Sequence, residues 1–156
     1  MRIILEGCDG TGKTTLAKIL AERYKLDICH CTQRDAADFD FYYNTTRKDD
    51  VVWDRHTIGE LIYPSVFNRR SQITFDEVVL VIAKLRQQGG KIFVLTADSE
   101  VIEKRLTDRG NEDQRILNMH DYIDKVFKLY AERLFIPVID TSKMTLDEIF
   151  KLVEEN

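Results

Sequence analysis

Short apolar runs alternate along the chain with longer segments of helical periodicity. The apolar runs are typical of buried strands and occupy residues 2–6, 26–31, 51–53, 91–97 and 137–140. Helical spacing of apolar residues predicts helices over residues 15–24, 56–68, 74–88, 99–107, 117–134 and 146–154. Thr74 with Glu77 three residues later resembles a capping box, and Gly89 and Gly90 end the helix that it begins.

Strands separated by helical crossovers predict an α/β fold with a five-stranded parallel sheet, flanked by helices in three layers. Residues 33–50 have no clean period, and residues 108–116 form a charged segment that we expect to be a loop. The helix over 117–134 carries Tyr122, Val126, Tyr130 and Leu134 along one stripe.

Size and charge indicate one small domain that does not span a membrane. The chain has 156 residues, 32% of them charged, and no apolar run approaches the roughly 20 residues that a spanning helix needs. The first ten residues lead directly into a glycine-rich loop, so we expect no removable signal. The net charge of −4 argues weakly against a broad nucleic-acid surface, which usually carries a basic stripe.

The three cysteines indicate a reducing, cytoplasmic compartment. They are odd in number and lack a CxxC pair, which is typical of reduced thiols. Cys29, His30 and Cys31 invite a zinc interpretation. Alternation along a strand would place His30 on the face opposite the two cysteines, and no fourth ligand is near in sequence, so we expect no zinc site.

The most specific pattern is GCDGTGKT at residues 7–14, which is a complete phosphate-binding loop. Gly7, Gly12, Lys13 and Thr14 fill its required positions between a predicted strand and a predicted helix. The glycines let backbone N–H groups surround an anion, and the helix N-terminus adds partial positive charge. Lys13 is expected to reach the β- and γ-phosphates of a nucleotide, and the Thr14 hydroxyl to bind Mg²⁺.

A second cluster is VVWDRH at residues 51–56. Asp54 follows an apolar strand, where enzymes with such a loop keep the acid that holds Mg²⁺. Arg55 is placed to bind a second phosphate through its guanidinium. The alternative is a solvated pair at a helix start, with Asp54 as the N-cap.

The charged segment at 108–116 carries arginines suited to phosphoryl transfer. Arg109 and Arg115, with Arg105 just before them, surround Glu112 and Asp113. Arginines on a closing loop can neutralise the charge on a transferred phosphoryl group and exclude water. A plain polar connection between helices is the alternative.

These motifs together resemble the thymidylate kinase family of phosphate-loop nucleoside monophosphate kinases. The resemblance rests on LEGCDGTGKTTLAKIL at the start, DRH at 54–56 followed by Tyr63, KRLTDRGNEDQRI, and PVIDTS near the end. It implies a three-layer P-loop kinase domain over 1–156, with an acceptor-binding region at about 33–72 and a lid at about 105–117.

The resemblance also implies roles for individual residues. ATP would be bound by Gly7, Gly10, Thr11, Gly12, Lys13, Thr14, Thr15, Arg105 and Thr141. The acceptor would be bound by Asp9, Arg34, Arg55 and Tyr63. Two further acceptor candidates lie where the chain departs from the family pattern: Glu60, one helical turn beyond His56, is expected to face the acceptor sugar, and Tyr42 belongs to an aromatic cluster that suits a base. Lys13, Asp54, Arg55, Arg109 and Arg115 would be catalytic, and Thr14 and Asp54 would hold Mg²⁺. Some family members carry an arginine where this chain has Gly10, so here the catalytic arginine would come from the lid.

The chain departs from the family pattern on the acceptor side. Only 19 residues separate Arg34 from Asp54, and the usual longer segment that holds the base is shortened. The aromatic residues between them, Tyr42 included, suit either stacking on a base or packing in the core.

We therefore expect Mg²⁺-dependent transfer of a phosphoryl group from ATP to a deoxynucleoside monophosphate. A kinase acting on a deoxynucleoside, or on a modified base or 5′ end in DNA, is the alternative, so a nucleic-acid partner stays open. A nucleotide-binding switch without kinase activity ranks third, because no Asn-Lys-x-Asp guanine signature is present. The sequence leaves a homodimer open.

Overall fold

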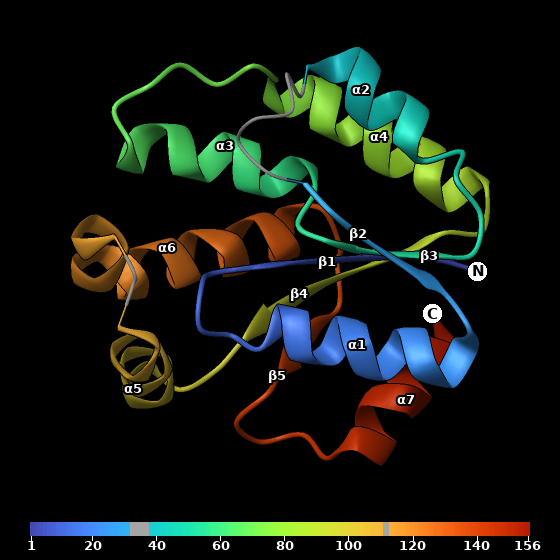
Figure 1. The fold of residues 1–156 in the computed structure, drawn as a ribbon. Helices are drawn as coiled ribbons and strands as arrows, with labels where there is room; N and C mark the ends of the chain where they lie inside the picture. The colour runs from blue at the N-terminus through green and yellow to red at the C-terminus, as the bar shows by residue number, and fades with distance from the viewer. Residues whose placement is uncertain (32–37, 111–112) are drawn as a thin grey trace.

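The structure is a computed structural model and describes residues 1–31, 38–110 and 113–156. Its centre is a parallel five-stranded sheet (Figure 1). The strands are β1 (Arg2–Gly7), β2 (Asp27–His30), β3 (Val51–Asp54), β4 (Lys91–Thr96) and β5 (Val138–Asp140). Their order in the sheet is β2-β3-β1-β4-β5. The predicted fold class, a five-stranded parallel sheet flanked by helices, is confirmed.

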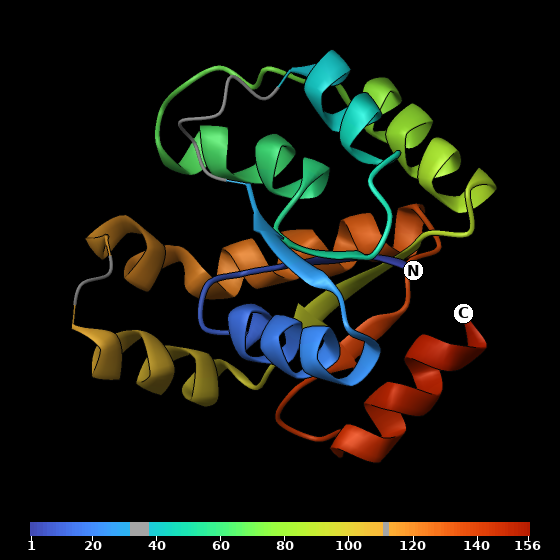
Figure 2. The ribbon, with the colours of Figure 1, turned by 45° about the vertical axis from the view of Figure 1, so that its right-hand side comes forward.

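Helices cover both faces of the sheet, which makes three layers (Figure 2). One face carries α1 (Lys13–Tyr24) and α7 (Leu146–Glu155). The other carries α3 (Thr57–Val66), α4 (Phe75–Gln87) and α6 (Gln114–Arg133). Two further helices pack on this second layer, α2 (Phe39–Thr45) against α4 and α5 (Ser99–Arg109) against α6.

Alternation along β1 divides the core between the two layers. Ile3 and Leu5 belong to the cluster formed with α1 and α7, whereas Ile4 belongs to the cluster formed with the opposite helices. All three are at most 1% exposed. Full burial of an aliphatic side chain contributes about 1.5–3 kcal/mol, so both layers are held to the strand that leads into the glycine loop.

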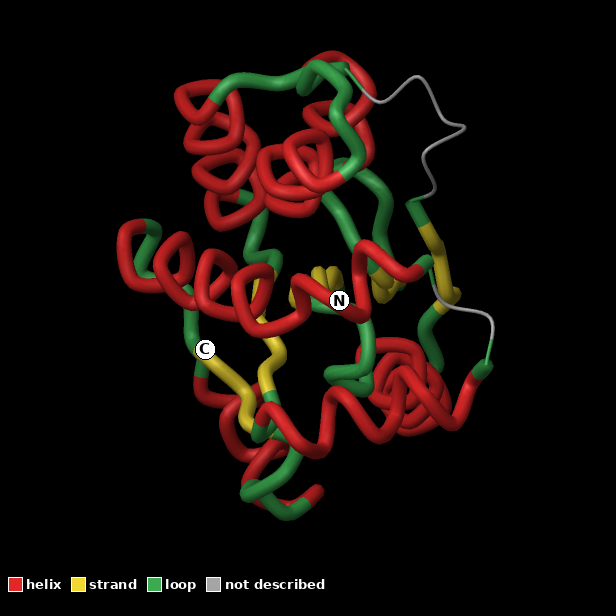
Figure 3. Tube along the Cα trace, turned by 90° about the vertical axis from the view of Figure 1, so that its left-hand side faces the viewer, coloured by secondary structure: helices red, strands yellow, loops and turns green. Residues whose placement is uncertain are grey.

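The sheet register brings the candidate residues to one edge. Leu5 of β1 pairs with Asp54 of β3, and Gly7 pairs with Leu95 of β4, so these three strands end together. In Figure 3, the side of the molecule that carries the loop between β1 and α1 faces the viewer. Open parallel sheets bind their ligands at this carboxyl edge.

Two local expectations need correction. Residues 39–45 form the helix α2, which starts at Asp38 because its side chain accepts the N–H of Phe41 at 3.0 Å. Both ends of the charged segment at 108–116 are helical, since α5 continues to Arg109 and α6 begins at Gln114. Tyr122 is 53% exposed, because α6 buries the neighbouring stripe that contains Ile123 and Phe127.

The Thr74–Glu77 capping box at the start of α4 is confirmed. Within the described part of the chain, no helix is both long and apolar enough to cross a membrane.

Candidate active site

The glycine loop fills residues 8–12, between β1 and α1. Gly10 and Gly12 have φ values of 83° and 90°, a region that favours glycine. A Cβ on Gly10 would lie 3.1 Å from the carbonyl oxygen of Ile102 and 3.2 Å from Cγ of Leu106. An arginine therefore does not fit at position 10 without a shift of α5. The first turn of α1 contains no acidic side chain, which leaves its N-terminal charge for a phosphate.

Lys13 is enclosed by this loop. Its ammonium donates to the carbonyl oxygens of Gly7 at 2.9 Å and Cys8 at 2.8 Å, and the residue is 5% exposed. Burial and the nearby charge of Arg55 lower the pKa of the Lys13 ammonium. An ammonium has three donors, so one donor remains after these two bonds. A bound phosphate would accept this remaining N–H and place negative charge next to the ammonium.

Thr14 and Asp54 meet next to the loop. The Thr14 hydroxyl donates to Oδ2 of Asp54 at 2.6 Å, and Oδ1 of Asp54 is buried with no hydrogen-bond partner among the described residues. A buried carboxylate oxygen is costly unless a cation or water satisfies it, and Mg²⁺ prefers hydroxyl and carboxylate oxygens. The pair therefore fits Mg²⁺, which when bound would draw charge from phosphate oxygens.

Asp9, Arg55 and Tyr63 form one connected group on the other side of the loop. Arg55 pairs with Oδ1 of Asp9, and the Tyr63 hydroxyl donates to Oδ2 at 2.8 Å. The Arg55 guanidinium also lies 5.4 Å from the centre of the Tyr63 ring. Burial opposes the Asp9 charge, but Arg55, Lys13 and the Tyr63 hydroxyl together hold the pKa of that carboxyl below its usual value. Three residues from different elements thus gather one carboxylate and one guanidinium beside the phosphate loop.

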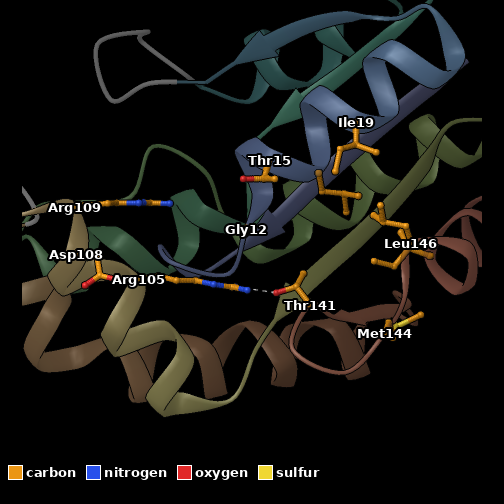
Figure 4. A pocket seen from close by; sticks show the side chains of 11 residues that line it. Gly12, Thr15, Ile19, Arg105, Asp108, Arg109, Thr141, Met144 and Leu146 are labelled. Atoms are coloured by element: carbon orange, nitrogen blue, oxygen red, sulfur yellow. Dashed lines mark hydrogen bonds between the residues drawn. The ribbon is translucent and has the colours of Figure 1, made fainter.

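A pocket of about 510 Å³ opens on the far side of the glycine loop (Figure 4). Apolar side chains of α1 and α7 line part of it, Leu16, Ile19, Leu146 and Ile149 among them. Arg105 of α5 donates to the carbonyl oxygen of Gly10 at 3.0 Å and to the Thr141 hydroxyl at 3.1 Å. Thr141 in turn donates to the carbonyl oxygen of Thr11 at 2.8 Å. The size and mixed lining suit a nucleotide base next to its phosphates.

The two arginines expected to act from a lid face different places. Arg109 is the last residue of α5 and lines the nucleotide pocket. Arg115, in the first turn of α6, pairs with Asp113 at 2.6 Å and lies 4.7 Å from the centre of the Phe67 ring of the segment after α3. Gly110, with φ 68°, ends α5, and Asp113 caps α6, so both arginines stand on helix ends rather than on a loop. Glu112 lies outside the described residues.

Two predicted acceptor residues already have partners. Tyr42 is 3% exposed and packs 5.0 Å from the His56 ring, centre to centre. Both oxygens of Glu60 accept from the Arg69 guanidinium, at 2.6 and 2.7 Å. Arg34 lies outside the described residues. The structure thus places the Tyr42 ring in the core and leaves a role of Glu60 at the acceptor sugar a prediction.

The sequence interpretation missed other polar residues near this edge. Glu6 is a fully buried carboxylate immediately before the loop, and its position among apolar residues was a signal that could have identified it. His30, at the end of β2, brings Nδ1 to 3.3 Å from Oδ2 of Asp54. No local pattern connects His30 with Asp54, because only the pairing of β2 with β3 brings them together.

Comparison with known proteins gives a family and several relatives. Residues 3–124 match the family model AAA_18, described as an AAA domain. A protein of Methanosarcina acetivorans, provisionally assigned as an adenylate kinase, is 26% identical over 117 residues, which cover 74% of this chain and 62% of that protein. A "Probable thymidylate kinase" of Methanocaldococcus jannaschii is 25% identical over 181 residues, which cover 96% and 91% of the two chains.

A solved structure agrees over nearly the whole fold. The YorR protein from Bacillus subtilis, in complex with phosphorylated GDP, superposes with a TM-score of 0.81 at 26% identity. The match covers 99% of this chain and 94% of YorR. The first two relatives are named as kinases, one for adenylate and one for thymidylate, and YorR was solved with a guanine nucleotide bound.

Proposed function

Because this chain belongs to the AAA_18 family of AAA domains and is a nucleotide kinase, we propose that it transfers the γ-phosphate of ATP to a deoxynucleoside monophosphate. The observation that carries the proposal is the group of Asp9, Arg55 and Tyr63 beside a complete phosphate loop. A nucleotide donor needs the loop, Lys13 and a metal site. An additional guanidinium held next to that machinery suits a second, acceptor phosphate.

In this proposal an oxygen of the acceptor phosphate bonds to the γ-phosphorus of ATP. The bond from that phosphorus to the bridging oxygen breaks, and ADP leaves. Lys13 and the loop N–H groups hold the donor phosphates, with the base in the pocket lined by Arg105 and Thr141. Thr14 and Asp54 would hold Mg²⁺. Arg55 orients the acceptor phosphate, so that catalysis comes from positioning and charge stabilisation.

The lid arginines complete the proposed mechanism. Gly10 supplies no charged side chain, and a Cβ there would lie only 3.1 Å from the carbonyl oxygen of Ile102, so an arginine for the transferred group comes from elsewhere. Arg109 borders the donor pocket, and Arg115 lies over Phe67 on the acceptor side. We propose that closure of the region at about 105–117 brings them toward the phosphoryl group and excludes water.

The acceptor region at about 33–72 is proposed to hold the nucleoside part of the substrate. Thymidylate is one candidate, and guanine nucleotides are another because YorR was solved with phosphorylated GDP. We also propose a single domain that works in the cytoplasm, with ATP and a small nucleotide as its partners.

The test is ADP formation from ATP and Mg²⁺ with a panel of acceptors. Each deoxynucleoside monophosphate is paired with its deoxynucleoside, and a short oligonucleotide is added. We expect turnover with at least one monophosphate and none with the nucleosides. In Arg55→Ala, the KM for that monophosphate should rise roughly 10- to 100-fold, the size of a charge-assisted contact, while the KM for ATP changes far less. Turnover with nucleosides or the oligonucleotide alone would favour the alternative acceptors.

A further inference from the structure

Glu6 carries a carboxylate into the core at the end of β1. The residue is 0% exposed, and its Oε1 accepts the N–H of Ile58 at 2.7 Å. The N–H groups of His56 and Gly59 also face this carboxylate. Its Oε2 has no hydrogen-bond partner in the described part of the chain. Above about pH 7, where its carboxyl is ionised, Glu6 therefore supplies from a neighbouring strand an anionic cap at the N-terminus of α3.

Burying a carboxylate at this position costs free energy of folding. Burial raises the pKa of the Glu6 carboxyl to about 7, although the three N–H groups and the charge of Lys13 oppose that rise. Removing a carboxylate from water costs free energy that a neutral residue of similar size would avoid. Stability alone therefore does not explain an ionisable group at this position.

The carboxylate holds one end of a strained turn. Arg55 has a φ of 74°, a left-handed conformation that costs a branched or long side chain roughly 1 kcal/mol or more. Its N–H donates to the carbonyl oxygen of Leu5 at 2.9 Å, and three residues later the N–H of Ile58 donates to Glu6. Leu5 and Glu6 of β1 thus bind the two ends of the turn, at Arg55 and at Ile58, and this turn presents the Arg55 side chain. Tyr63, which lies on α3 as Ile58 does, donates to Asp9 and completes the contacts of that carboxylate.

We propose that Glu6 is a positioning residue for the acceptor site, whose carboxylate fixes the start of α3 and so holds Arg55 and Tyr63 against Asp9. The inference rests on the proposed function, because it assigns the benefit to the acceptor phosphate. The charged or titratable groups that face Glu6 are Lys13 from α1, Arg55 from the turn and Tyr42 from α2. Of these, Arg55 is the group that the proposed function places at the acceptor phosphate.

The variant that tests this is Glu6→Gln, which keeps the shape and one acceptor oxygen but removes the charge. Its matched control is Glu77→Gln, since Glu77 caps α4 through Thr74, away from the site. We expect Glu6→Gln to raise the KM for the acceptor roughly tenfold, with the KM for ATP within about twofold. Its melting temperature at pH 8 should equal or exceed that of the wild type. Glu77→Gln should melt lower and leave both KM values unchanged.

Amide hydrogen exchange tests the positioning without turnover. The segment 55–63 should exchange faster in Glu6→Gln than in the wild type or in Glu77→Gln, because the start of α3 loses its charged cap. Unchanged exchange there, or equal increases in both KM values, would overturn the assignment of Glu6. A wild-type enzyme that turns over no nucleoside monophosphate would instead overturn the proposed function, and the exchange experiment would still decide whether Glu6 fixes the turn.

Discussion

Replacing the Glu6 carboxyl by an amide should stabilise the protein increasingly as the pH rises. The wild-type carboxyl is enclosed in the core, and burial raises its pKa from 4.5 to about 7. An amide cannot ionise, so Glu6→Gln avoids the cost of a buried charge. The same substitution is expected to raise the free energy of unfolding and to weaken binding of the acceptor.

The sign and size follow from the two pKa values. Below pH 4.5 the carboxyl is protonated in both the folded and the unfolded chain. Between pH 4.5 and about 7 the unfolded chain ionises while the folded chain keeps its proton, so the wild-type free energy of unfolding falls as the pH rises. The loss is complete above about pH 7. At roughly 1.4 kcal/mol per pKa unit, the shift from 4.5 to about 7 corresponds to about 3 kcal/mol.

Urea unfolding of the wild type and Glu6→Gln at several values between pH 4.5 and 8 measures this effect. The difference between the two free energies of unfolding should grow by about 3 kcal/mol across that range. Subtraction removes the contributions of other groups, including His56, whose buried imidazole has its pKa lowered to about 3. A difference that stays constant with pH would mean that Glu6 is solvated or paired in solution, and the reasoning would fail.

Three further variants test the donor side and the lid. Lys13→Ala should lower kcat by roughly a hundredfold or more, since one stabilising donor can contribute about 3 kcal/mol; a rate within tenfold of wild type would exclude Lys13 from the mechanism. Asp54→Asn should raise the Mg²⁺ concentration for half-maximal rate more than the KM for ATP, and an unchanged Mg²⁺ midpoint would make Asp54 only structural. The Arg109→Ala/Arg115→Ala double variant should depress kcat by on the order of a thousandfold with little change in either KM. A normal kcat in it would refute the lid mechanism.

The parts of the fold that the sequence predicted are those set by local pattern. The strand at residues 2–6 and the glycine loop follow from an apolar run and four spaced residues, and the Thr74 cap follows from a four-residue signature. The position of Asp54 next to the loop also followed, because parallel strands end at one edge.

The parts that it did not predict depend on tertiary contacts. Tyr122 and Ile123 lie on neighbouring stripes of α6 with the same spacing, and only packing decides that Ile123 is buried. The short helix α2 is fixed by its Asp38 cap and by packing against α4, not by a clear apolar period. Glu60 looked available to a substrate, but Arg69, nine residues later, occupies its carboxylate.

The central claim is that the acceptor already carries a phosphate, and the identity of the product tests it most directly. The enzyme, ATP, Mg²⁺ and the best acceptor of the panel are incubated, and the products are read by ³¹P NMR. The account predicts that the monophosphate signal of the acceptor disappears and that two nucleoside diphosphates form for each ATP consumed, so the α- and β-phosphorus signals of the diphosphates reach twice the intensity that ADP alone would give. A new monophosphate ester formed from an unphosphorylated acceptor, or release of free phosphate with no phosphorylated acceptor, would contradict it.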